Sequence, residues 1–332
     1  MNIQLLYGAQ QSPWGGVNSF FRNFRKYAAR DDRIALVDSS RKADIILTAG
    51  NYVGPGKQLS WKHLWWLSKW RGVTWPSAYS SSPNPQRGKI VFRVDGLRKV
   101  YTGCWNSSDK RLIRNLEFAD NVVFQSKFSK ETFDNLGVQV PSSQLVINNG
   151  ADEEVFFPEK ARKPPIGKDL VLISNSWSTN SYKGFHNIAA ISCQEGVRVL
   201  HIGRWPEGVC KENVTSLGIM GPREIATVFR QGDFFFFPSK NEACPNVLFE
   251  ALACALPAIY LKSGGNIEIC GGGKFGIPFE EKTFGDGQVP ELLAQAREKH
   301  DEIRANIIED INRFSFTRCF SEYLAFFESL LV

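Results

Sequence analysis

The chain has 332 residues, 43% of them hydrophobic, so it is long enough to bury a core, and its length favours two domains over one. Lys and Arg number 40 against 34 Asp and Glu, and this mild excess of +6 suits anionic small molecules or membrane surfaces as well as nucleic acid. Composition excludes a disordered chain and leaves the partner open.

The seven cysteines are odd in number and contain no C-x-x-C pair, which argues against a disulfide framework or a structural zinc site. No apolar run reaches the roughly 18 to 20 residues that cross a bilayer. The N-terminal stretch "MNIQLLYGAQ" lacks the charged start and apolar core of a signal peptide. We therefore expect a cytoplasmic protein in a reducing compartment, with peripheral attachment to a membrane left open.

In chain order, short apolar runs alternate with amphipathic helical patterns, which is typical of a parallel-sheet α/β fold. Residues 17–29 form the clearest predicted helix, because apolar side chains line one face and Arg22, Arg25 and Lys26 the other. The predicted strands of the first half are residues 3–8, 33–38, 44–50, 89–96, 121–126 and 144–149.

The segment 61–75 holds five of the nine tryptophans together with Lys62, Lys69 and Arg71. This composition suits a core helix, a surface on which sugars stack, or a membrane interface. As a hypothesis, it helps to hold a glycan or lipid-linked acceptor.

The polar, proline-containing stretch 156–169 has the composition of a linker. The predicted strands beyond it are 170–175, 197–203, 233–239 and 257–261, and the predicted helices are 184–195, 222–231, 245–255 and 290–312. We therefore predict two Rossmann-like, doubly wound parallel-sheet domains, 1–157 and 158–315, facing an inter-domain cleft that binds the ligand. A last helix, 316–332, is expected to pack back onto the first domain.

Two carboxylates stand in the otherwise small and apolar stretch "NEACPNVLFEALACALP" (241–257). A helix is predicted from Pro245, and its first N–H groups, from Asn246 and Val247, would form an anion site suited to a phosphate. Glu250 lies one turn further in, where an unpaired carboxylate would cost several kcal/mol. A ribose diol is a suitable partner for it, whereas a surface glutamate, or for Glu242 a turn or cap residue, is the structural alternative.

The segment "PSKNEACPNVLFEALACALPAI" resembles the corresponding part of family 4 retaining glycosyltransferases, the glycosyl transferases group 1, which have the GT-B fold. "SPWGGVNSF", "INNGADEEVFFP", "SYKGF" and "SGGNIE" resemble other signatures of that family, and "FRVDGLRKVY" is similar to the R-x-D-G element of one of its branches.

The resemblance implies a role for each matching position. Glu250 would hold the ribose and Glu242 would lie beside the donor sugar, while Lys183 would contact the diphosphate. Gly15 and Gly16 would let the backbone approach the donor or acceptor. Together with Asn246 and Val247, these positions would form the donor site.

Two positions depart from the family pattern. Ser178 stands where many members carry a phosphate-binding arginine, so that cation is lost or supplied elsewhere, for which Arg204 is the candidate. "RVDG" replaces a histidine after the fourth strand, which makes Asp95, with Arg93, the candidate group near the reacting carbon. Catalytic roles are thus expected for Glu242, Lys183 and Asp95.

The implied function is transfer of a hexose, with retention, from a UDP- or GDP-linked sugar to a hydroxyl of a sugar or glycan acceptor, in polysaccharide or glycan biosynthesis. No D-x-D pair occurs, which agrees with an enzyme that needs no metal and no cofactor. The alternatives are a sugar-nucleotide epimerase of the same fold and a non-catalytic nucleotide-sugar-binding protein. Nucleic acid is not an expected partner.

Overall fold

The computed structural model describes residues 1–9, 15–54, 57–70, 88–159 and 167–332, and only the backbone of residues 66 and 68–70. The chain divides into an N-terminal unit, Met1–Asn148 with Cys319–Val332, and a C-terminal unit, Asn149–Arg318. The sequence-based boundary at 157/158 differs from this division. Residues from Asn149 onward join the C-terminal unit because Ala151 exchanges backbone hydrogen bonds with Phe314 and Phe316. Part of the predicted linker, 160–166, lies outside the described residues.

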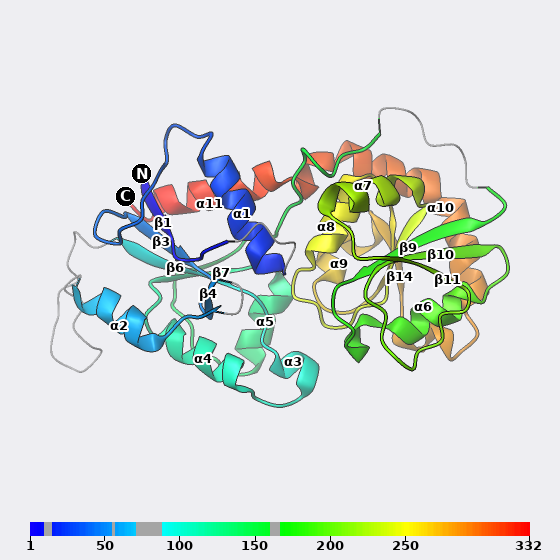
Figure 1. Ribbon diagram of the computed structural model, residues 1–332, viewed down its shortest axis with the longest axis horizontal. Coiled ribbons are helices and arrows are strands. Elements are labelled where there is room, and N and C mark those ends of the chain that lie inside the picture. The colour runs from blue at the N-terminus through cyan, green and yellow to red at the C-terminus, as the bar shows by residue number, and fades with distance from the viewer. Residues whose placement is uncertain (10–14, 55–56, 71–87, 160–166) are drawn as a thin grey trace. The chain divides into compact units, whose positions relative to one another are not determined.

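The N-terminal unit is built on a six-stranded sheet in the order β2-β1-β3-β6-β7-β8, with every pair parallel (Figure 1). Its strands are β1 (Asn2–Leu5), β2 (Ala35–Leu36), β3 (Ile45–Thr48), β6 (Lys89–Val94), β7 (Asn121–Phe124) and β8 (Gln144–Val146). A short antiparallel pair, β4 (Tyr52–Gly54) and β5 (Lys57–Gln58), stands apart from it. Of the predicted strand 33–38, only the two exposed residues of β2 are in strand conformation. Among the described residues, β2 is an edge strand that pairs with β1 alone.

The C-terminal unit has a second parallel sheet in the order β11-β10-β9-β12-β13-β14. Its strands are β9 (Leu170–Ser176), β10 (Val197–Gly203), β11 (Val214–Gly218), β12 (Phe234–Phe237), β13 (Ala258–Leu261) and β14 (Gly276–Phe279). The two edge strands, β11 and β14, were not predicted. The first has a single buried residue, Val214, and the second contains the exposed Pro278, a residue that sheets accept at edges.

Helices cover both sheets, which confirms the predicted doubly wound α/β fold (Figure 1). In the N-terminal unit they are α1 (Gly16–Ala28), α2 (Trp61–Trp70), α3 (Lys99–Thr102), α4 (Ser107–Leu116) and α5 (Lys127–Asn135). In the C-terminal unit they are α6 (Phe185–Ser192), α7 (Pro222–Gln231), α8 (Asn246–Ala253), α9 (Asn266–Ile269) and α10 (Val289–Glu309). The last helix, α11 (Phe316–Ser329), begins in the C-terminal unit and continues into the N-terminal one.

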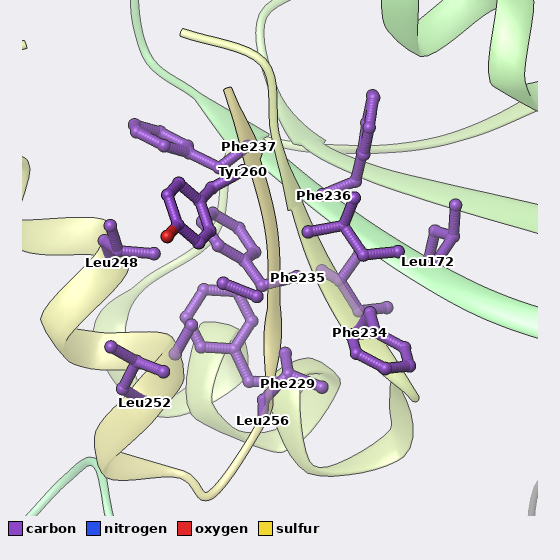
Figure 2. Packing of buried hydrophobic residues seen from close by; sticks show 14 of the residues in the cluster. Leu172, Phe229, Phe234, Phe235, Phe236, Phe237, Leu248, Leu252, Leu256 and Tyr260 are labelled. Atoms are coloured by element: carbon purple, nitrogen blue, oxygen red, sulfur yellow. The ribbon is translucent and has the colours of Figure 1, made fainter. Parts of the chain in front are cut away.

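The core of the C-terminal unit is centred on the four consecutive phenylalanines of β12. Successive side chains of a strand point to opposite faces, so this strand fills both layers of the core. Figure 2 shows Phe235 and Phe237 on the side of α8, and Phe234 and Phe236 on the other side. All four are at most 2% exposed, so β12 is fixed from both faces and ends in a defined position.

The C-terminal part of α11 packs on α1. Phe24 of α1 lies 5.1 Å from Phe320 and 6.2 Å from Phe327, measured between ring centroids, and Tyr323 fills the space between them and Phe20. These aromatic side chains are nearly or fully buried. The last helix is therefore part of the N-terminal core.

Helix α2 covers the first part of the tryptophan-rich segment 61–75. Leu64 and Leu67 are buried, whereas Trp61 and Trp65 are partly exposed. The hypothesis that segment 61–75 holds an acceptor also rests on residues 71–75, including Trp75, and these lie outside the described residues. In the part of the chain that the structure describes, no helix is both long enough and apolar enough to cross a bilayer.

Candidate donor-binding and active site

The order of strands in the C-terminal sheet reverses between β9 and β12. The chain proceeds from β9 through β10 to β11, then returns to the other side of β9 with β12. In open parallel sheets, ligands bind outside the carboxyl ends of the strands at such a switch point. The segments that leave β9 and β12 carry Lys183 and Glu242, so the two residues are brought to this point by the topology.

Lys183 ends a short 3-10 turn, Ser181–Lys183, that lies against the segment after β12. The backbone N–H of Lys240 donates to the carbonyl of Tyr182 at 2.8 Å. Gly184, with φ at +71°, approaches so closely that a Cβ there would lie 2.6 Å from the carbonyl oxygen of Pro238. The glycine of the "KGF" signature therefore lets the lysine turn rest directly on the β12 loop.

The Lys183 ammonium forms an ion pair with the carboxylate of Glu242. Both side chains are largely buried, at 23% and 16% exposure. The sequence predicted both residues near the donor, but it did not predict that they bond to each other. Charge-assisted hydrogen bonds of this kind fix both partners, so the pair presents a cation in a defined position at the switch point.

The glycines of the "SGGN" signature hold the Glu242 loop. A Cβ at Gly264 would lie 2.5 Å from the carbonyl oxygen of Glu242, and one at Gly265 would lie 2.2 Å from that of Ala243. The Gly265 N–H donates to the Glu242 carbonyl at 2.7 Å, and Ser263 bonds both the backbone and the side chain of Asn241. Only glycine allows this contact between two loops.

Helix α8 begins at Asn246, one residue later than predicted, and Pro245 is its N-cap. The first-turn amides of Asn246 and Val247 thus belong to a helix N-terminus that follows the Glu242 loop. The side chain of Asn149, which is 4% exposed, donates to the Cys244 carbonyl at 3.3 Å and to Asn246 Oδ1 at 2.7 Å. The sequence missed this residue, although "INNG" was quoted as a family signature.

Glu250 lies one turn further along α8 and is partly buried. Its neighbours on both sides, Phe249 and Ala251, are buried, as is most of the helix. Glu250 therefore lies on the side of α8 that is partly accessible to solvent, and not on the side that packs into the core.

Arg204 follows β10 and is exposed, close to the end of β9. Its N–H donates to the Ser176 carbonyl at 3.0 Å, and its guanidinium lies 4.8 Å from the ring centre of Trp177. His201, whose pKa is lowered by burial, donates from Nε2 to the Arg204 carbonyl at 3.1 Å. Arg204 is thus held at the same strand ends as Ser178, where this chain lacks the arginine of the family pattern.

In the N-terminal unit, Asp95 follows β6 and is organised by two buried side chains. Arg93, 1% exposed, bonds Asp95 Oδ1 at 2.9 Å and Gln125 Oε1 at 2.7 Å, while its guanidinium lies 4.2 Å from the ring centre of Phe20. The amide of Gln125 also donates to Asp95 Oδ1. Arg93 is therefore buried beneath Asp95, in a place to orient this carboxylate. The sequence missed Gln125.

The Asp95 side chain is 49% exposed, and within the described residues the hydrogen bonds to its carboxylate go to Oδ1. Tyr7, which follows β1, lies close enough to Asp95 for the carboxylate charge to affect the pKa of its phenol. Burial raises the pKa of Tyr7, and the negative charge of Asp95 raises it further. The phenol is consequently kept protonated beside a carboxylate that has one oxygen available.

Gly15 is the N-cap of α1, with φ at +71°, and Gly16 is the first residue of that helix. Among the residues that the structure describes, none places a heavy atom within 4 Å of a Cβ built at Gly15. The preceding residues of the "SPWGG" loop, 12–14, lie outside the described residues. Within the described part of the chain, no three His, Cys, Asp or Glu side chains are grouped in a way that could hold a metal ion.

Comparison with known proteins relates the chain to one class. Residues 177–298 match the sequence model of the family Glycosyl transferases group 1. The chain is similar along 99% of its length to the structure of sucrose-phosphate synthase from Thermosynechococcus elongatus, with a TM-score of 0.71, 15% identity and 98% of that chain covered. The fold is therefore GT-B, as predicted.

Two further similar proteins are associated with a nucleoside diphosphate or a nucleotide sugar. Anabaena HepE, solved in complex with UDP and glucose, aligns with 99% of this chain and 99% of its own, at a TM-score of 0.68 and 15% identity. A GDP-mannose-dependent alpha-mannosyltransferase of Corynebacterium glutamicum is 25% identical over 152 residues, or 41% of this chain. That match spans only 35% of the relative's length.

The close approach at Gly264 gives a test of loop packing. We expect Gly264→Ala to lower the free energy of unfolding by clearly more than the about 1–2 kcal/mol that a left-handed alanine costs, because the new Cβ would collide with the backbone of Glu242. Gly272→Ala is the matched control, since Gly272 has φ at +65° and no atom within 4 Å of its Cβ position. Equal losses for both variants in urea unfolding would contradict the account.

The buried guanidinium gives a second test. Asp95→Ala should cost about 1.5–3 kcal/mol of stability, because Arg93 loses its charged partner. Adding Arg93→Met should cost less than the sum of the two single changes, since the uncompensated charge is gone. Asp95→Asn, which keeps an acceptor oxygen but loses the charge, should cost less stability than Asp95→Ala. The measurement is urea unfolding of wild type, Asp95→Ala, Arg93→Met and the double variant. If the double variant loses the sum of the two single losses, the pair is not coupled.

Proposed function

We propose that the protein is a retaining glycosyltransferase that moves a hexose from a nucleoside diphosphate sugar to a hydroxyl of a sugar or glycan acceptor. The observation that carries this proposal is the Lys183–Glu242 pair at the switch point of a sheet whose segment 177–298 matches the model of glycosyl transferases group 1. The uridine diphosphate in HepE and the GDP-mannose of the Corynebacterium relative support UDP or GDP as the donor's nucleotide.

The diphosphate is the ligand for which the C-terminal unit is best equipped. Lys183 offers a fixed ammonium group, and the first amides of α8, from Asn246 and Val247, offer hydrogen-bond donors at the positive end of a helix. Arg204 supplies the second cation in place of the arginine missing at Ser178. Glu250 accepts hydrogen bonds from the ribose hydroxyls, and Glu242 orients both Lys183 and the sugar.

The proposed reaction needs no protein nucleophile and no metal. The acceptor oxygen bonds to the anomeric carbon on the face from which the diphosphate departs, so the configuration is retained. The departing phosphate oxygen takes the acceptor's proton as the bond to the anomeric carbon breaks. Lys183 and the α8 amides stabilise the charge that develops on the leaving group, which is where preorganised donors contribute most.

The N-terminal unit contributes Asp95, which contacts the substrate through its accessible oxygen. Arg93, buried beneath it, acts as a positioning residue, and Gly15 and Gly16 leave room for a ligand at the start of α1. A cytoplasmic location and a lipid-linked acceptor are parts of the same proposal.

Donor binding is tested by calorimetry with UDP-, GDP- and ADP-sugars. One of them should bind to wild type, and Glu250→Ala should weaken it at least tenfold, because a hydrogen bond to a charged group contributes about 1.5–3 kcal/mol. Glu298→Ala, a change of the same kind at an exposed position of α10, is the control and should bind as wild type. If Glu250→Ala binds the donor equally well, the proposed role of Glu250 is wrong.

A further inference from the structure

The positive charge of the chain is concentrated in one unit. Met1–Asn148 with Cys319–Val332 contain 21 Lys and Arg against 12 Asp and Glu, whereas Asn149–Arg318 contain 19 against 22. The formal charge is therefore +9 for the N-terminal unit and −3 for the C-terminal unit. The overall value of +6 conceals a strongly basic unit, and charge of this density attracts anionic partners.

A third of the Lys and Arg residues of the N-terminal unit lie on three neighbouring helices or directly beside them. Figure 1 shows α2, α4 and α3 following one another along one border of the N-terminal unit. The guanidinium of Arg114 on α4 lies 4.3 Å from the ring centre of Trp61 on α2, which joins the two helices. We define the basic face as residues 61–70 and 98–117. Its cations are Lys62, Lys69, Arg98, Lys99, Lys110, Arg111 and Arg114.

The carboxylates of the basic face do not neutralise these cations. The face has only Asp109 and Glu117, and Asp109 is 2% exposed, with its oxygens bonded to the backbone amides of Arg98 and Lys99. Among the described residues, no ion pair joins Lys62, Lys110 or Arg111 to a carboxylate.

Three surface lysines of the C-terminal unit are, by contrast, paired: Lys240, Lys262 and Lys274 each have a carboxylate within 2.7–3.1 Å. Lys62, Lys110 and Arg111 of the basic face are therefore available to an external anion.

The basic face also contains tryptophans. Trp105 is 38% exposed, and the ammonium of Lys99 lies 5.3 Å from its ring centre. Trp61 and Trp65 of α2 are partly exposed as well. Indole rings favour the headgroup level of a bilayer, and lysine and arginine there meet lipid phosphates. A soluble polyanion bound through its charge alone would use the cations and leave the exposed indoles unexplained.

We propose that the basic face binds the surface of a bilayer that contains anionic lipids. The helices lie flat on it, with the cations at the phosphates and the tryptophans at the headgroup boundary. This proposal is independent of the sugar donor, because none of the proposed donor-binding residues belongs to the basic face, residues 61–70 and 98–117.

The test is co-sedimentation of the full chain with vesicles of phosphatidylcholine alone, or with phosphatidylglycerol added, in 0.1 M and 1 M NaCl. Lys62→Glu combined with Lys110→Glu changes two exposed side chains of the face that have no protein partner to lose. Arg223→Glu combined with Lys299→Glu makes the same change of charge at exposed positions of α7 and α10. Trp105→Ser probes the aromatic contribution.

Wild type and the Arg223/Lys299 control should bind the anionic vesicles in 0.1 M NaCl and not the neutral ones, and binding should weaken in 1 M NaCl as the charges are screened. The Lys62/Lys110 variant should bind at least about 20-fold more weakly, since each basic residue near such a surface contributes about fivefold. Trp105→Ser should be weaker than wild type.

Three results would overturn the proposal. The first is equal binding by the Lys62/Lys110 variant and the control, and the second is equal binding of wild type to neutral vesicles. The third is retention of wild type by a soluble anionic polysaccharide without any binding to vesicles, which would make the basic face a polyanion site.

Discussion

The candidate site depends on backbone segments that touch where only glycine allows it. At the carboxyl ends of the C-terminal sheet, a Cβ at Gly203, Gly184, Gly264 or Gly265 would lie 2.1–2.6 Å from a carbonyl oxygen of a neighbouring segment. The contacts at Gly184, Gly264 and Gly265 join connections that come from different strands, and the contact at Gly203 joins the last residues of β10 and β9. Because protein interiors are close-packed, such contacts transmit the rigid position of the strands to the loops.

That rigidity decides what the charged groups can do. Lys183 and Glu242 stand on two loops that contact each other directly, and the phenylalanines of β12 fix the strand from which the second loop leaves. An ammonium held in this way needs little reorganisation when a phosphate leaves, and preorganisation is the main source of electrostatic catalysis. In the N-terminal unit, buried side chains and not glycine contacts hold the charged group in position: Arg93 and Gln125 both bond one oxygen of Asp95.

Much of the fold could be predicted from the sequence because its signals are local. Buried parallel strands are nearly continuous apolar runs, and α1 and α7 have clear amphipathic patterns, so their bounds agree within a residue or two. The edge strand β11 was missed because an edge strand needs no apolar run on both faces, and β14 because it is only four residues long and contains Pro278, which argues against a strand. The division between the units was placed later than observed because it is set by bonds of Ala151 to residues more than 160 positions away.

The site was predictable where a family motif covered it, and not where partners are distant in sequence. The motif pointed to Lys183 and Glu242 separately, but their ion pair spans 59 positions and follows from sheet order. Gln125 and Asn149 carry no local pattern, since an amide beside a strand end is common. The overall charge of +6 likewise hid the contrast between the units, which becomes visible only once the chain is divided.

The central claim is that Lys183 stabilises a departing diphosphate. The most direct measurement is the rate at which nucleoside diphosphate is released from the donor by wild type, Lys183→Met and Lys240→Met. Lys240 is the matched control, because it lies next to the same loop and pairs with Glu281 instead. We predict that Lys183→Met lowers kcat about 100-fold or more, as loss of one oxyanion donor does, while Lys240→Met turns over as wild type. Release by Lys183→Met at the wild-type rate would contradict the account.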